Sequence, residues 1–99
     1  MKEITKCLTV STKHITLDTF IDLDVEANCN VWGLPVYEKA GYGYWIYCSE
    51  EMYDEYPEGG NIPKDLWDCM KLAHKHDCRW LCIDCDGEEL KDFLPLYRW

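Results

Sequence analysis

Residues 62–76 carry the pattern that most constrains the fold of this chain, an apolar face at helical spacing. Apolar side chains recur at i, i+4, i+7, i+8 and i+11, which places them on one side of a helix: Ile62, Leu66, Cys69, Met70 and Ala73. Asn61 can cap the first turn, where Pro63 is also tolerated. We therefore expect an amphipathic helix whose apolar side packs against other elements of a core.

Four segments have the composition of strands: residues 4–11, 36–38, 44–48 and 79–84. The segment 44–48 is aromatic and β-branched, and Gly41 and Gly43 before it supply a turn, so it is expected to form a hairpin with the strand that precedes it. Residues 79–84 are apolar nearly throughout, as in a strand buried on both faces. A tail at 96–99 is expected to pair as a last edge strand.

Residues 15–27 fit two secondary structures. The odd positions alternate with mostly polar even ones, which is the strand period. In a helix, apolar residues cover one broad side and acids lie opposite: Leu17, Phe20, Ile21, Leu23 and Val25 against Asp18, Asp22 and Glu26. Asp24 then falls inside the apolar side. Because Asp is depleted in strands, we favour the helix and keep the strand as the alternative.

The resulting order is β-α-β-β-α-β, which matches the ferredoxin-like split βαβ pattern or a variant of it. Right-handed crossovers would place both helices on one face of an antiparallel sheet. Residues 1–99 are expected to form a single α+β domain, near the lower end of the usual domain size. The opposite face of the sheet would need cover from aromatic side chains, a loop or a partner.

The chain is strongly acidic. Nineteen Asp and Glu residues against ten Lys and Arg residues give a formal net charge of −9. Nucleic acid and anionic membranes both require basic clusters, so neither is expected as a direct partner, whereas a protein with a basic surface is. No apolar run approaches the roughly 18 residues of a membrane span. Residues 1–6 do not begin a signal peptide, so a cytoplasmic location is expected.

The seven cysteines are an odd number without secretory context, which favours reduced thiols or metal ligands over disulfides. Five potential ligands lie within residues 74–85: His74, His76, Cys78, Cys82 and Cys85. Thiolate and imidazole suit zinc, and Cys82 and Cys85 have ligand-like spacing. However, residues three apart on a strand point to opposite faces, and buried cysteines are ordinary small hydrophobic residues. We expect no cofactor and keep zinc as an alternative.

Residues 49–60 are the main candidate for partner binding. The segment holds five carboxylates and two tyrosines without a basic residue, between a strand and a helix start, so an exposed acidic loop is expected. Carboxylates suit a basic groove, and tyrosines are good interface anchors. The candidate partner-binding residues are Glu50, Glu51, Tyr53, Asp54, Glu55, Tyr56 and Glu58. The alternative is an acidic surface that only keeps the protein soluble.

Two other places could carry chemistry. Asp84 and Asp86 follow a strand and could hold Mg²⁺, although an Asp-Gly turn needs no function. His14 lies among hydroxyl residues and could act as a base for a nucleophile. No nucleophile elbow or supporting acid accompanies it, so we expect His14 to bond a backbone group instead.

Five phrases, taken in order, resemble a bacterial family of unknown function found on plasmids, prophages and other mobile elements. They are Ser-Thr-Lys-His-Ile-Thr at 11–16, Leu-Pro-Val-Tyr at 34–37, Gly-Tyr-Trp-Ile-Tyr at 43–47, Trp-Leu-Cys-Ile-Asp-Cys-Asp-Gly at 80–87 and Leu-Pro-Leu-Tyr-Arg-Trp at 94–99. The resemblance implies a mobile-element setting and assigns neither an activity nor catalytic residues.

We therefore expect a small acidic protein, not an enzyme, that binds another protein. Together with the resemblance, this predicts an inhibitor that occupies the basic groove of a nucleic-acid-binding host defence enzyme. One alternative is a metal-dependent enzyme or zinc-stabilised domain that uses Asp84, Asp86, Cys78, Cys82 and Cys85. Another is a homodimer formed through the uncovered face of the sheet.

Overall fold

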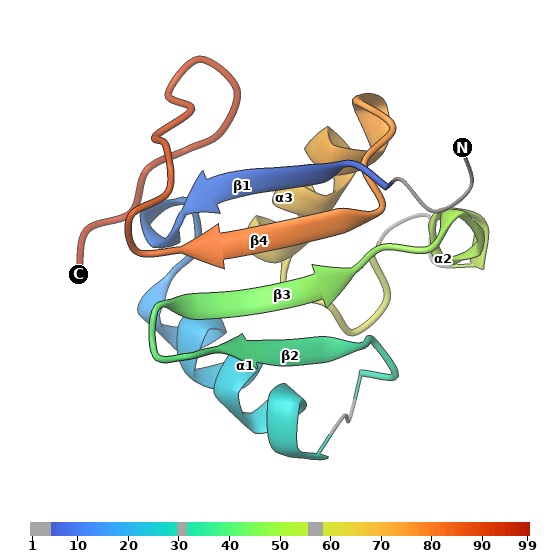
Figure 1. Cartoon of the computed structure of the whole chain (residues 1–99), viewed down its shortest axis with the longest axis horizontal. Helices are drawn as coiled ribbons and strands as arrows, with labels where there is room; N and C mark the ends of the chain where they lie inside the picture. The colour runs from blue at the N-terminus through green and yellow to red at the C-terminus, as the bar shows by residue number, and fades with distance from the viewer. Residues whose placement is uncertain (1–4, 30–31, 56–58) are drawn as a thin grey trace.

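A four-stranded mixed sheet with the strand order β1-β4-β3-β2 forms the centre of the fold (Figure 1). The structure is a computed structural model that describes residues 5–29, 32–55 and 59–99. Its elements are β1 (Cys7–Ser11), a 3-10 turn (Thr12–His14), α1 (Leu17–Cys29), β2 (Val36–Lys39), β3 (Gly43–Tyr47), α2 (Glu50–Glu55), α3 (Lys64–Lys75) and β4 (Trp80–Asp84). The α+β class and the hairpin of β2 and β3 are as expected.

The sheet differs from the expected antiparallel one. β3 runs antiparallel to β2 and to β4, but β1 pairs in parallel with β4. β1 is therefore an edge strand, and the ferredoxin-like strand order is not confirmed. Burial explains why β4, and not β1, has neighbours on both sides. Leu81, Cys82 and Ile83 of β4 are fully buried, whereas Cys7 and Thr9 of β1 are exposed. A continuous apolar strand is typical of a central position.

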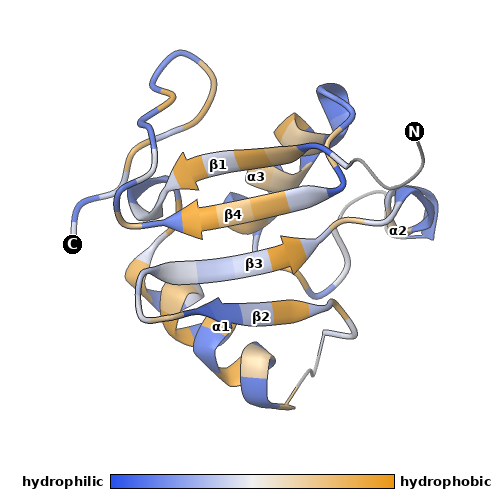
Figure 2. Ribbon diagram, viewed as in Figure 1, coloured by the Kyte–Doolittle hydropathy of each residue, from blue (hydrophilic) through white to orange (hydrophobic). Residues whose placement is uncertain are grey.

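Helices α1 and α3 lie behind the same face of the sheet, as expected (Figure 1). The inner face of the sheet is apolar, and its core residues include Val10, Ile46, Leu81 and Ile83. Figure 2 shows apolar residues concentrated along β1 and β4, while α1 alternates between apolar and polar residues along its length. The helix expected over 62–76 is confirmed as α3, whose Leu66, Cys69, Met70 and Ala73 are buried.

Residues 17–29 form a helix, so the helical interpretation of this segment is confirmed. Of its predicted apolar side, Leu23 and Phe20 pack in or against the core, whereas Leu17, Ile21 and Val25 are exposed. Thr19, Leu23 and Glu26 face the core. Polar contacts fix this rotation, since Thr19 Oγ1 donates a hydrogen bond to Asp65 of α3 at 2.8 Å. The backbone N–H of Thr16 donates to the other oxygen of Asp65 at 2.7 Å. The periodicity alone does not reveal these contacts.

Two other expectations need correction. The acidic segment predicted as a loop contains the short helix α2, because Met52 is buried and holds this turn against the core. Tyr56 and Glu58 lie outside the described residues. The tail at 96–99 forms no strand. It is held instead by hydrogen bonds from the Tyr97 N–H to the Lys13 carbonyl at 2.7 Å and from Trp99 Nε1 to the Ile15 carbonyl at 2.9 Å.

Candidate functional site

Helix α2 presents four of the predicted partner-binding carboxylates to solvent: Glu50, Glu51, Asp54 and Glu55. Glu50 forms an ion pair with Arg79 at 2.9 Å. Elsewhere in the described chain, no basic side chain forms an ion pair with Glu51, Asp54 or Glu55. Among the described residues, these three carboxylates therefore have no cationic partner.

Tyr53 has a structural role that the sequence did not indicate. Its hydroxyl donates a hydrogen bond to the Met70 carbonyl of α3 at 2.8 Å. Its ring stacks on His74 with the ring centroids 4.1 Å apart, and burial raises the pKa of the Tyr53 hydroxyl. Tyr53 therefore attaches α2 to α3, and its part in partner binding stays a prediction.

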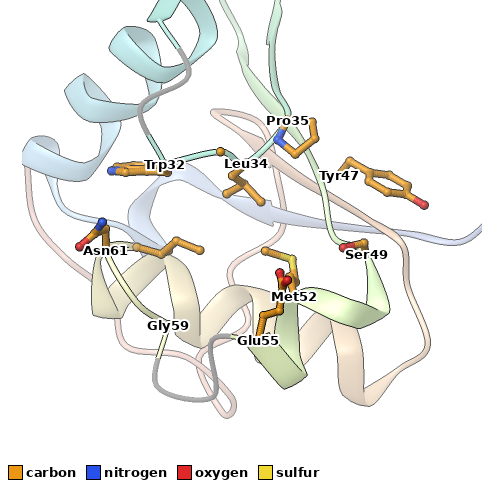
Figure 3. Close-up of a pocket in the computed structure, with 11 residues that line it drawn as sticks. Trp32, Leu34, Pro35, Tyr47, Ser49, Met52, Glu55, Gly59 and Asn61 are labelled. Atoms are coloured by element: carbon orange, nitrogen blue, oxygen red, sulfur yellow. The ribbon is translucent and has the colours of Figure 1, made fainter.

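A pocket of about 180 Å³ lies beside α2, and we call it the Trp32 pocket (Figure 3). It is lined by Trp32, Gly33, Leu34, Pro35, Tyr47, Ser49, Met52, Glu55, Gly59, Asn61 and Ile62. Four separate segments thus contribute to it: the loop before β2, the end of β3, α2 and the loop before α3. In Figure 3, Glu55 extends from α2 towards Met52, which places its carboxylate on the wall of the pocket.

The sequence did not single out Trp32, because it stands alone in a loop outside any motif. Its backbone N–H donates a hydrogen bond at 2.8 Å to the carboxylate of the buried Glu26, which fixes the loop against α1. Glu26 therefore does not belong to the acidic surface, although its place in the sequence suggested it. The half-buried Trp32 also lines a second depression of about 220 Å³, together with Asp22 and Val25 of α1.

The solvent side of α1 carries an unusual combination of residues, which we call the α1 face. It consists of the aliphatic residues Leu17, Ile21 and Val25 with the neighbouring carboxylates of Asp18 and Asp22. The aliphatic side chains are 46%, 53% and 47% exposed, respectively. Trp32 lines both the Trp32 pocket and the depression beside Asp22 and Val25, so the two depressions share this residue.

The cysteine and histidine candidates are not gathered into one site. Cys78 is buried, with its thiol 3.7 Å from the His76 carbonyl, while Cys85 is exposed. Cys82 lies on β4, 3.5 Å from the ammonium of Lys39. Within the described ranges, one group of three potential metal ligands has its ligand atoms within 4.8 Å of one another, namely Asp84, Cys85 and Asp86.

Asp84 is engaged by cationic and backbone donors. It forms a salt bridge with Lys39, and its second oxygen accepts a hydrogen bond from the Asp86 N–H at 2.8 Å. The hydrogen bond from Lys39 lowers the pKa of the Asp84 carboxyl, and the bond from Asp86 lowers it further. Lys39 thus already supplies the positive charge that a metal ion would bring.

His14 bonds backbone groups, as the sequence led us to expect. It is 1% exposed, and its Nδ1 donates a hydrogen bond to the Pro95 carbonyl at 2.7 Å. Its Nε2 accepts a hydrogen bond from the Leu90 N–H, also at 2.7 Å. Both ring nitrogens therefore serve to hold the C-terminal segment.

The sheet face opposite the helices covers itself in part with aromatic side chains. Trp80 contacts the rings of Tyr37, Trp45 and Tyr47 at centroid separations of 6.1, 6.4 and 5.2 Å. A shallow depression of about 280 Å³ remains between Cys7, Tyr37, Trp45 and Trp80.

The chain belongs to a family of unknown function, DUF5983, whose C-terminal domain matches residues 7–99. Comparison with curated proteins found no match, and comparison with solved structures found none either. Among the helices described, none is long and apolar enough to cross a membrane.

Proposed function

We propose that this protein is a small, non-enzymatic module that binds a partner protein with a basic surface. The α1 face carries this proposal. Leu17, Ile21 and Val25 do not fill the core, because each is about half exposed. Leu23 of the same helix is the aliphatic residue that is fully buried. Apolar residues at i, i+4 and i+8 along a solvent-facing helix are the arrangement by which a helix occupies a partner's groove.

The charges around these residues define the partner. Asp18 and Asp22 flank the aliphatic residues, and no described basic side chain forms an ion pair with either. The whole chain carries a formal charge of −9. A groove with an apolar floor and a rim of Lys or Arg complements this face. A second copy of the chain would bring like charges together, which disfavours self-association through α1.

The finer form of the proposal concerns the class of partner. Nucleic-acid-binding proteins carry basic grooves, and the carboxylates of α1 and α2 can occupy such a groove in place of phosphates. Combined with the mobile-element setting that the sequence resemblance implies, this supports an inhibitor of a host defence enzyme that acts in the cytoplasm. Glu51, Asp54 and Glu55 would extend the contact beyond α1.

The test begins with affinity purification of the partner from a bacterial host and identification by mass spectrometry. The dissociation constant is then measured at several salt concentrations for the wild type and for a variant with D18N, D22N, E51Q, D54N and E55Q. We expect the wild type to lose affinity as salt rises, and the variant to bind more weakly with a shallower salt dependence. Nucleic acid should compete with the protein for the partner. Equal affinity of both forms, or binding unaffected by nucleic acid, would contradict the proposal.

A further inference from the structure

The Trp32 pocket has the chemistry of a site for a single cationic side chain. Apolar groups from Leu34, Pro35, Met52 and Ile62 form part of its lining, and Glu55 adds a carboxylate. Its volume of about 180 Å³ lies below the range of roughly 300–1,000 Å³ that drug-sized ligands occupy. The pocket is therefore matched to one extended side chain with an aliphatic stem and a charged end.

The Glu55 carboxylate determines that a ligand of this pocket should carry a positive charge. No described lysine, arginine or histidine forms an ion pair with it. Glu51 and Asp54, on the same helix, add negative potential nearby, and the net charge of −9 reinforces it. An anionic ligand would be repelled here, and a neutral apolar ligand would gain no ion pair with the carboxylate.

We infer that the Trp32 pocket binds an arginine side chain presented by the partner protein. Trp32 provides an aromatic group on which a planar guanidinium can stack, and the Glu55 carboxylate can accept its N–H donors. The methylene groups of the arginine would contact Leu34 and Met52. Lysine offers the same charge, but it lacks the planar group that stacks on aromatic rings and bonds a carboxylate through two donors.

This inference rests on the proposed function, because it names one residue type through which the basic partner is recognised. It also adds a constraint on position. Trp32 lines both this pocket and the depression beside Asp22 and Val25, so a partner on the α1 face would place its arginine within reach of the pocket. The partner's apolar groove and its arginine would then be adjacent features of one surface.

The probe for this test is Nα-acetyl-arginine amide, titrated into ¹⁵N-labelled protein and followed by NMR. The neutral isostere Nα-acetyl-citrulline amide and Nα-acetyl-lysine amide serve as comparison ligands. We expect saturable shifts of the Trp32 indole N–H and of the Gly33, Ser49 and Asn61 amides. The indole signal is assigned with the W32F variant.

Two matched variants make the result specific. E55Q should weaken arginine amide binding by about 3- to 5-fold, as expected for loss of one solvent-exposed ion pair. E51Q removes the same charge from the same helix at a position that does not line the pocket, so it should change the affinity by less than about 1.5-fold. Citrulline amide should produce no saturable shift, and lysine amide should bind more weakly than arginine amide.

Three results would overturn the inference: shifts that never saturate, shifts spread equally over α1 and α2, or equal effects of E55Q and E51Q. Lysine binding as tightly as arginine would overturn the choice of arginine. A hexalysine peptide, titrated separately, distinguishes failure of the pocket assignment from failure of the proposed function. If hexalysine shifts the α1 and α2 signals while the arginine probe misses the pocket, the acidic surface stands and the pocket assignment is wrong. If neither ligand binds, both are wrong.

Discussion

The imidazole Nε2 of buried His14 accepts a hydrogen bond from the backbone N–H of Leu90 at 2.7 Å, across 76 positions of sequence. The other ring nitrogen donates to the Pro95 carbonyl. One side chain thus joins the start of the chain, just after β1, to two points of the C-terminal segment. The histidine that most resembled a catalytic base is an organising residue of the fold.

Replacing His14 with alanine is expected to release the C-terminal segment and destabilise the fold. The change removes the two part-buried hydrogen bonds to the Leu90 N–H and the Pro95 carbonyl, each worth about 0.5–1.5 kcal/mol. Urea denaturation measures the loss, and faster amide exchange at Leu90 locates it. H76A, at an exposed histidine, is the control and should change stability by less than about 0.5 kcal/mol. Equal stability of both variants would contradict this role.

The orientation of α1 predicts opposite effects for two neighbouring aliphatic residues. Ile21→Ser is expected to change the free energy of unfolding by no more than about 0.5 kcal/mol, because Ile21 is exposed. Leu23→Ala should cost about 2–5 kcal/mol, since Leu23 is fully buried. Denaturant titration of both variants checks this. A large loss for Ile21→Ser would mean that the α1 face packs against the protein itself.

The Lys39–Asp84 pair predicts a stability difference that depends on pH. Because the pKa of Asp84 is lowered in the folded state, its contribution is complete above the unfolded-state value of about 3.9. That contribution is lost as the pH falls through the lower folded-state pKa. Wild type should therefore be more stable than D84N at pH 6, and the gap should close towards pH 2.5. D86N is the control, and a gap that is constant with pH would contradict the pairing.

Zinc or magnesium ions are expected to leave the thermal midpoint of the protein unchanged. A metal that binds the folded state would raise the midpoint by mass action. Lys39 already neutralises Asp84, and Cys82 lies beside the same ammonium, so a second cation meets repulsion there. Calorimetry with and without added metal, and elemental analysis of purified protein, provide the measurement. Stoichiometric zinc that disappears in the C82S and C85S variants would support the metal alternative instead.

The sequence predicted those helices and strands whose pattern of apolar residues matches the side chains that are buried in the structure. The amphipathic stripe of α3, the hairpin of β2 and β3 and the apolar run of β4 all appear where expected. The pairing of β1 with β4 could not be predicted in the same way, because strand order depends on which strand the core buries on both faces. Local periodicity does not determine it.

The candidate site was predicted only in part. The carboxylates of α2 are exposed as expected, but Tyr53 is bound to α3 by its hydroxyl and its ring. The sequence did not show which side of α1 faces solvent. The hydrogen bonds to Asp65 that fix the rotation of the helix join residues 46 and 49 positions apart. Trp32 gave no signal, because its role depends on four segments that meet only in the folded chain.

Site-specific crosslinking in cells tests the central claim most directly. A photoreactive phenylalanine is placed at Ile21 on the α1 face and, as a control, at Lys71 on the exposed side of α3. We predict a crosslink from position 21 to a basic segment of one nucleic-acid-binding protein, absent from position 71 and reduced when D18N and D22N are added. Equal crosslinking from both positions, or a crosslink from position 21 that the two aspartate substitutions leave unchanged, would contradict the account.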